Sequence, residues 1–124
     1  MSKVPEQLFY RESHEWIDPT SGAVGITYHA QNELTDVVFV ELPKVGAMVK
    51  AGEHVAVVES VKAASDIFSP VSGEIVAVND ELTEDPSLIN SDPYGEGWIF
   101  ELKITKPSEL DVLMDSSSYR QHIE

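Results

Sequence analysis

The chain has 124 residues, 42% of them hydrophobic and none of them cysteine, which fits one folded domain over residues 1–124 and excludes disulfides, thiolate metal sites and cysteine nucleophiles. Eight basic residues against 22 acidic ones give a formal net charge of −14. Such a charge disfavours nucleic acid and anionic membranes as partners and favours proteins with basic docking faces. The alternative is that the acidic residues serve only to keep the protein soluble.

No stretch predicts a membrane span or a targeting segment. The longest apolar runs, such as Val37–Val40, are far too short to cross a bilayer. The first six residues match neither a signal peptide nor an Arg-rich transit peptide. We therefore expect a cytoplasmic protein with no membrane partner.

Short β-forming runs separated by turn residues fill the first third of the chain. Residues 1–7 are expected to form a loose end, and residues 29–34 leave room for only one or two helical turns. Strands are expected at four places, 8–10, 15–17, 23–27 and 37–42. The last of these does not alternate apolar and polar residues, so we expect it to be buried on both faces.

A single lysine stands in the middle of the next group of strands. Gly46 and Gly52 bracket a short strand, and further strands are expected at 54–58, 67–68 and 73–78. Lys62 lies between the first two of these, among small residues, so we expect it near the tip of a hairpin with its ammonium open to a partner. An isolated exposed lysine is usually only a solvated charge.

The segments on either side of Lys62 resemble each other. Residues 43–49 and residues 70–76 share the spacing Pro-x-x-Gly-x-x-Val. This match suggests a short internal duplication with the lysine at the turn between two similar β-units. It favours a fold that presents one amine.

The last third of the chain contains one more strand and two helical segments. Asp85 and Pro86 can begin a brief helix, and residues 98–104 are expected to form the last strand. Pro107 opens a C-terminal helical segment over 107–124, whose apolar face is made by Leu110, Leu113 and Met114. Many short strands and little helix predict a mainly β fold, a compact β-sandwich or flattened barrel with a docked C-terminal helix.

The common catalytic and metal-binding patterns are absent from the sequence. It contains no P-loop and no dinucleotide glycine fingerprint. Its four histidines show no His-x-x-x-His spacing, so no metal site is expected. Ser13 and His14 are adjacent, and adjacent residues of a strand point to opposite faces, which would prevent a nucleophile pair. We therefore expect a chain that is not an enzyme.

The surroundings of Lys62 carry a family resemblance. The stretch Glu59-Ser-Val-Lys-Ala-Ala-Ser-Asp66, followed by Ser69-Pro-Val-Ser-Gly-Glu74, resembles the lipoyl-attachment region of glycine cleavage system H proteins. Further stretches resemble the same family in its order: Ser13–Trp16, Gly25–Thr27, His29–Gln31, Val37–Pro43, Leu88–Asn90 and Pro93–Trp98. The resemblance covers residues 8–114.

The resemblance implies a fold, a cofactor and a set of partners. The fold is a barrel-sandwich hybrid of two antiparallel sheets, and the cofactor is lipoate, bound through an amide to Lys62 on an exposed hairpin. The implied function is that of a carrier that shuttles the aminomethyl group of glycine between glycine decarboxylase (P protein), aminomethyltransferase (T protein) and dihydrolipoamide dehydrogenase (L protein). A lipoate-attaching enzyme is a fourth implied partner.

In this family the loaded arm folds into a cleft on the carrier's own surface. The positions that match here are Ser13, Glu15, His29 and Asp66. A carboxylate can hold the ammonium of the cargo by charge-assisted hydrogen bonds, and a lined cleft limits water. The resemblance therefore makes Glu15 the strongest candidate for a cargo clamp.

Two positions depart from the family pattern. Tyr28 stands where the family commonly has Asp, and Thr35 stands where it commonly has Gly. Neither position is part of the attachment motif around Lys62. Tyr28 adjoins His29 of the expected cleft, so it bears on the chemistry of that cleft.

Other carriers share parts of this pattern. Biotin carriers resemble this topology, but their lysine lies between methionines, whereas Val61 and Ala63 flank Lys62. A lipoyl domain of a 2-oxoacid dehydrogenase complex is usually tethered by Ala/Pro-rich linkers, and this sequence shows no such linker and no second domain. A stand-alone lipoyl donor that hands its group to other proteins is a further alternative.

Overall fold

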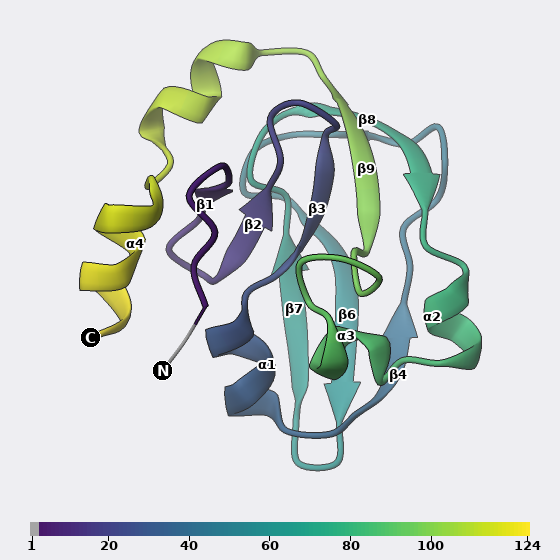
Figure 1. Cartoon of the computed structure of the whole chain (residues 1–124). Helices are drawn as coiled ribbons and strands as arrows, with labels where there is room; N and C mark the ends of the chain where they lie inside the picture. The colour runs from purple at the N-terminus through teal and green to yellow at the C-terminus, as the bar shows by residue number, and fades with distance from the viewer. Residues whose placement is uncertain (1–2) are drawn as a thin grey trace.

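The structure is a computed structural model that describes residues 3–124. Two antiparallel β-sheets pack against each other, with short helices at their edges (Figure 1). The larger sheet has the strand order β1-β2-β3-β9-β8-β5, with strands at Phe9–Tyr10, Glu15–Ile17, Ala23–Ile26, Phe100–Ile104, Gly73–Val78 and Met48–Val49. The smaller sheet has the order β4-β6-β7, with strands at Val37–Glu41, His54–Ser60 and Ala64–Phe68. The predicted mainly β fold of two antiparallel sheets is confirmed.

Most of the hydrophobic core lies between the two sheets. Both sheets contribute fully or nearly fully buried aliphatic and aromatic side chains to it, among them Val24, Phe100, Val58 and Ile67. This arrangement buries one face of each sheet, and a second apolar cluster covers part of the other face of the larger sheet. The base of the β6–β7 hairpin is anchored in the main core, whereas its turn is exposed.

The helices are short, and two of them contribute buried side chains to the main core. They are α1 at Tyr28–Leu34, α2 at Glu81–Glu84, α3 at Leu88–Ser91, a 3₁₀ helix η1 at Pro107–Val112 and α4 at Ser116–Ile123. Leu82 of α2 and Ile89 of α3 are fully buried in that core. The brief helix expected after Asp85 is α3, which begins slightly later than predicted, at Leu88. Helix α2 was not predicted from the sequence.

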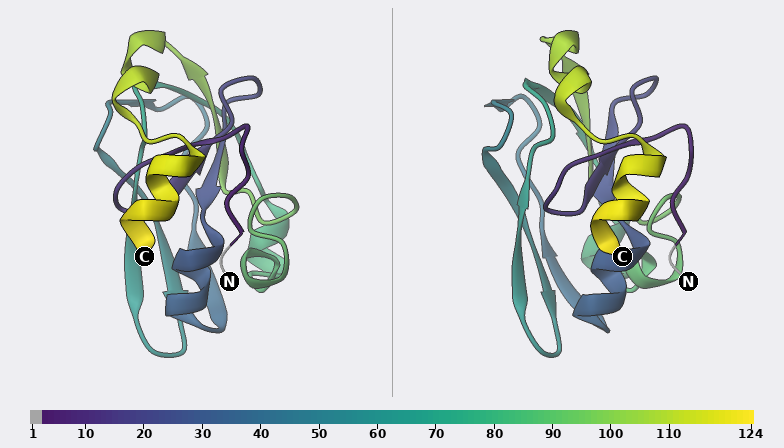
Figure 2. Two further views of the ribbon diagram at one scale, coloured as in Figure 1. Left: turned by 60° about the vertical axis from the view of Figure 1, so that its left-hand side comes forward. Right: turned by 90° about the vertical axis from the view of Figure 1, so that its left-hand side faces the viewer.

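The C-terminal segment is helical in two separate pieces. The expected single helix face of Leu110, Leu113 and Met114 is wrong, because Leu113 is extended, with φ −83° and ψ 161°. Met114 instead forms an isolated β-bridge with Tyr10, whose backbone N–H donates to the Met114 carbonyl at 2.8 Å. Strand pairing with β1 therefore interrupts the helix and redirects α4 onto the side of the larger sheet (Figure 2).

The N-terminal residues pack against α4 as part of a second apolar cluster. This cluster consists of Val4, Leu8, Tyr10, Trp16 and Tyr119. Val4 is only 4% exposed, and its carbonyl accepts a hydrogen bond from Arg120. Val4 is therefore held against the fold, in contrast to the loose end expected over residues 1–7, while residues 1 and 2 lie outside the described part of the chain.

Strand β4 is not buried on both faces, contrary to the sequence-based expectation. Val38 is 54% exposed and Phe39 is 51% exposed. The pairing with β6 shifts register between Val37 and Phe39, so Val38 is an extra residue in a β-bulge. The bulge breaks the alternation of the strand and exposes two successive apolar side chains.

The two segments with the shared Pro-x-x-Gly-x-x-Val spacing pair with each other. Strand β5 of the first segment runs antiparallel to β8 of the second, with Val49 opposite Gly73. The two glycines serve different purposes. Gly46 has φ 94°, whereas a Cβ on Gly73 would lie 2.5 Å from the carbonyl oxygen of Lys103. This pairing agrees with two similar β-units that join at the β6–β7 hairpin.

Thr35, one of the two departures from the family pattern, occupies a strained position after α1. Its φ of 63° and ψ of −144° fall in a region that glycine adopts freely and a β-branched residue does not. Its backbone N–H donates to the Gln31 carbonyl at 3.0 Å and ends the helix. The common glycine of the family therefore has a conformational reason at this position.

We predict that Thr35→Gly stabilises the protein. Relief of the strained backbone outweighs the extra chain entropy of glycine in the unfolded state, so the free energy of unfolding should rise by about 1 kcal/mol in urea titrations. Asn32→Gly, inside the same helix, is the matched control and should lower it by a few tenths of a kcal/mol. A loss of stability in Thr35→Gly would show that the threonine side chain makes a compensating contact.

Candidate functional site

Lys62 occupies the turn that joins β6 to β7, at the far end of the smaller sheet (Figure 1). In Figure 2 this hairpin extends past the neighbouring elements in both views. Val61, Lys62, Ala63 and Ala64 are all exposed. The structure thus agrees with the expectation of an accessible lysine at a hairpin tip.

The hydroxyl group of Ser60 organises this turn. It accepts hydrogen bonds from the backbone N–H groups of Lys62 at 3.2 Å and Ala63 at 3.1 Å, and the Ser60 N–H donates to the Ala63 carbonyl at 2.8 Å. Neither Val61 nor Lys62 has a positive φ, so the branched Val61 is not strained. Ser60 was not singled out from the sequence, although serine commonly bonds turn amides in this way.

A cleft of about 220 Å³ lies between α1 and β7. Its apolar lining consists of Ile26, Ala30, Leu34 and Ile67, and its polar lining of Ser13, His14, His29, Glu33 and Ser65. One end of the cleft is near the hairpin, because Leu34 ends α1 and the Val61 N–H donates to the carbonyl of Asp36, two residues further on. The cleft therefore runs from the Lys62 hairpin toward the start of β2.

The structure brings Ser13 and His29 together at this cleft but does not bring Asp66 there. Ser65 and Ile67 line the cleft, and successive residues of a strand point to opposite faces. Asp66 therefore points to the outer face of the smaller sheet. It lies 3.3 Å from His54, and both side chains are more than half exposed.

Glu15 is buried behind the cleft and contributes no lining to it. It is 1% exposed, and its Oε2 accepts a hydrogen bond from the Phe68 N–H at 3.0 Å. Its Oε1 accepts from the Ser13 hydroxyl, which in turn accepts from Arg11. Burial raises the pKa of Glu15, while the hydrogen bonds from Phe68 and Ser13 act against that rise.

Glu33 is a cleft carboxylate that the sequence analysis missed. Its Oε1 lies 3.7 Å from Nε2 of His29, and the two side chains are 70% and 26% exposed. The pair is four residues apart on α1, so both side chains share one helix face. That spacing was the signal available in the sequence.

Tyr28, the other departure from the family pattern, does not line the cleft.

His14 connects the cleft to the C-terminal helix. Its Nδ1 lies 2.7 Å from the Tyr119 hydroxyl, and its ring centroid lies 4.8 Å from that of His29 and 5.6 Å from that of His122. Burial, followed by the charges of His29 and His122, lowers the pKa of His14. Its backbone has φ 79°, in the left-handed region that asparagine also adopts, so an asparagine can replace His14 without new backbone strain.

Ser13 and His14 do not form a nucleophile pair, although for a different reason from the one expected. They precede β2, and both line the cleft, so the alternation of a strand does not apply to them. The Ser13 hydroxyl bonds to Glu15 and Arg11, whereas the His14 ring bonds to Tyr119. Each group is engaged elsewhere.

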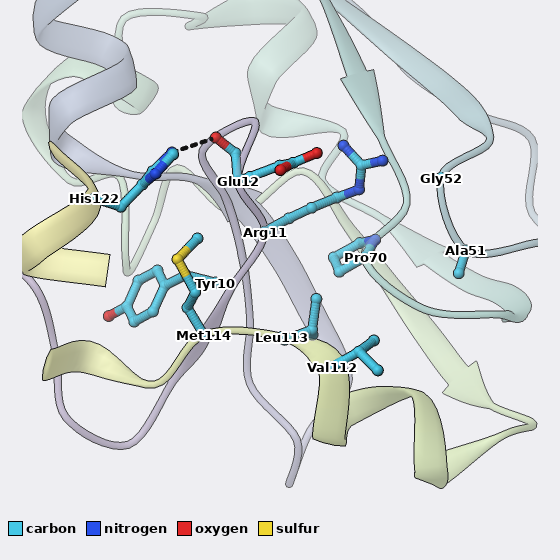
Figure 3. A pocket seen from close by; sticks show the side chains of 10 residues that line it. All are labelled: Tyr10, Arg11, Glu12, Ala51, Gly52, Pro70, Val112, Leu113, Met114 and His122. Carbon is cyan, nitrogen blue, oxygen red and sulfur yellow. Dashed lines mark hydrogen bonds between the residues drawn. The ribbon is translucent and has the colours of Figure 1, made fainter. Parts of the chain in front are cut away.

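A larger pocket of about 470 Å³ lies on the other side of the turn at residues 11–14 (Figure 3). Arg11, Met114 and His122 are among its lining residues, and the His122 ring bonds to the Glu12 carbonyl at 3.0 Å. Lys62 lines neither this pocket nor the cleft, but the cleft is the one that approaches its hairpin. Over residues 3–124, no group of three or more His, Cys, Asp or Glu side chains could hold a metal ion.

An exposed lysine on an ordered turn, with a cleft beside it, is the arrangement expected of a carrier protein. The family model described as Glycine cleavage H-protein matches residues 8–124. Glycine cleavage system H proteins of Salmonella arizonae and Methylacidiphilum infernorum are 55% and 54% identical to this chain, and the alignments cover 100% and 98% of it and 98% and 96% of the relatives. A crystal structure of the H protein of Mycobacterium marinum superimposes with a TM-score of 0.86, at 41% identity over 95% of this chain and 97% of that one.

The chain therefore belongs to the glycine cleavage H-protein family. The predictions of this family and of a non-catalytic lipoyl carrier in the glycine cleavage system are confirmed. In the described part of the chain, no helix is long and apolar enough to cross a membrane.

We predict that His14 makes the protein less stable in mild acid. Because the native state lowers the pKa of His14 below 6.5, the unfolded state binds its proton first as pH falls through that value. The free energy of unfolding should then decrease from pH 8 to pH 5.5. Urea titrations of wild type and His14→Asn should show a smaller decrease in the variant. Glu15 titrates with the opposite sign, but both proteins retain it. Equal slopes would contradict the assignment to His14.

Proposed function

We propose that this chain carries lipoate as an amide on Lys62 and that the cleft between α1 and β7 receives the loaded arm. The observation that carries the proposal is the position of Lys62 at an exposed hairpin tip beside one end of this cleft. Its neighbours Val61, Ala63 and Ala64 bear no charge and leave the amine approachable. These residues fit an amide-linked arm.

Lipoate, when attached to Lys62, would supply a disulfide whose opening provides one sulfur for the aminomethyl group of glycine and reduces the other sulfur to a thiol. Attachment requires an acyl group already activated by the attaching enzyme. The bond from Nζ to the acyl carbon forms as the bond to the activating group breaks, and the ammonium gives up two of its three protons to become a neutral amide that keeps one N–H. Lys62 thereby loses its positive charge, which lowers the formal net charge by one unit from −14.

The residues of the cleft have separable tasks in this proposal. Ile26, Ala30 and Ile67 provide an apolar surface for the hydrocarbon part of the arm. His29 and Glu33 lie at its polar side, where the exposed carboxylate of Glu33 can attract the ammonium of the cargo. Glu15 and Ser13 hold the wall behind it through their hydrogen bonds.

The proposed partners are the enzyme that attaches lipoate, glycine decarboxylase, the aminomethyltransferase and dihydrolipoamide dehydrogenase. The formal net charge of −14 supports fast, charge-steered encounters with basic faces on these partners.

We predict that Lys62 is the residue that receives lipoate. Lys62→Arg should accept none after incubation with lipoate, ATP and a lipoate ligase, as measured by intact mass and peptide analysis. It should retain its free energy of unfolding within about 0.5 kcal/mol, because the side chain is exposed. Lys50→Arg, at another exposed lysine, is the matched control and should be modified like wild type. Modification of Lys62→Arg would refute the assignment.

We predict that Glu33 slows the loss of the cargo from the loaded arm. Because its side chain is 70% exposed, screening limits the effect, and Glu33→Gln should release ammonia about two- to fivefold faster once partner enzymes are removed. Glu15→Gln should instead lower the free energy of unfolding by about 1–2 kcal/mol, because Glu15 is buried and accepts hydrogen bonds from Ser13 and Phe68. If only Glu15→Gln released cargo faster, at unchanged stability, Glu15 would be the clamp that the resemblance implies.

A further inference from the structure

Three exposed apolar side chains lie beside the Lys62 hairpin. Val38, Phe39 and Val61 are 54%, 51% and 67% exposed, and together we call them the hairpin patch. Phe39 on β4 lies opposite Glu59 on β6, and the Val61 N–H donates to the Asp36 carbonyl at 3.0 Å, just before β4. Strand pairing therefore brings this part of β4 next to the turn that carries the lysine.

The hairpin patch is not a by-product of core packing. Val37 and Val40, on either side of Val38 and Phe39, fill the core at 4% and 2% exposure, so the strand already supplies its buried side chains. The bulge at Val38 adds a residue that exposes more apolar surface. Single exposed apolar residues are common, whereas several together mark a contact surface.

The charges around the hairpin patch restrict what can cover it. Strands β4, β6 and β7 carry Glu41, Glu59 and Asp66 but no lysine or arginine. The exposed Asp36 adjoins Val61 through the backbone hydrogen bond already described. A partner that covers this patch should therefore present an apolar contact surrounded by basic side chains.

We propose that the hairpin patch is the docking surface for the enzyme that attaches lipoate, an inference that rests on the proposed function of Lys62. Lys62 is one of six lysines in the chain, and an amine alone does not distinguish it from the others. The attaching enzyme must bring its activated carboxyl group to Nζ itself, so it must touch the residues that flank the turn. An enzyme that acts at the far end of the arm can bind elsewhere on the carrier.

The test measures lipoylation of the complete, unmodified chain by a lipoate ligase with lipoate and ATP. Phe39→Ser and Val61→Ser should each lower kcat/KM for the carrier by about tenfold, mainly through a higher KM. Met48→Ser is the matched control, because Met48 is 63% exposed and lies on β5 of the other sheet. It should react like wild type. Urea unfolding midpoints should be equal in all four proteins, since the altered side chains are exposed.

Two results would overturn the proposal. The first is an unchanged kcat/KM in both patch variants, and the second is an equal loss in Met48→Ser. After the first result, a slower glycine decarboxylase reaction with lipoylated patch variants would show that a different partner covers the patch. If wild type itself were not modified at Lys62, the proposed function would fail first, so the two failures are distinguishable.

Discussion

One buried carboxylate connects the two sheets at the place where the cleft ends. Glu15 begins β2 of the larger sheet, and its Oε2 accepts the N–H of Phe68 at the end of β7 in the smaller sheet. Burial of a charge is costly unless hydrogen bonds compensate it, and here Ser13 completes the set. This interaction sets the position of β7 relative to the turn at residues 11–14. The shape of the cleft depends on that distance.

The β6–β7 hairpin combines a buried base with an exposed tip. Val58 and Ile67 lie in the core, while the tip is held only by its backbone and by the Ser60 hydroxyl. Changes at the tip should therefore have little effect on stability, whereas changes at the base alter packing. This division lets the chain expose an amine, and apolar side chains beside it, without weakening the core.

Local signals in the sequence predicted most of the strands and the accessible lysine. Glycine and proline residues indicated the turns around β5 and β8, and the motif around Lys62 identified the family of the chain. Features that depend on pairing between distant segments were not predictable in this way. The bulge at Val38 follows from the register with β6, and the break at Leu113 follows from the bridge between Met114 and Tyr10. The same limit applies to Asp66, because a motif match does not say which face of a strand a residue occupies.

The two acidic residues near the cleft show how environment decides the role of a carboxylate. Glu15 is 1% exposed and does not line the cleft, so an ammonium could reach it only if the hydrogen-bonded wall at Ser13 and Phe68 opened, and leaving the Phe68 amide unpaired would cost about 1–3 kcal/mol. Glu33 is exposed and needs no such exchange, but its attraction is screened. An interaction free energy of about 1 kcal/mol favours the docked arm over the free arm only about fivefold. Such weak binding suits a carrier, because the arm must leave the cleft each time a partner arrives.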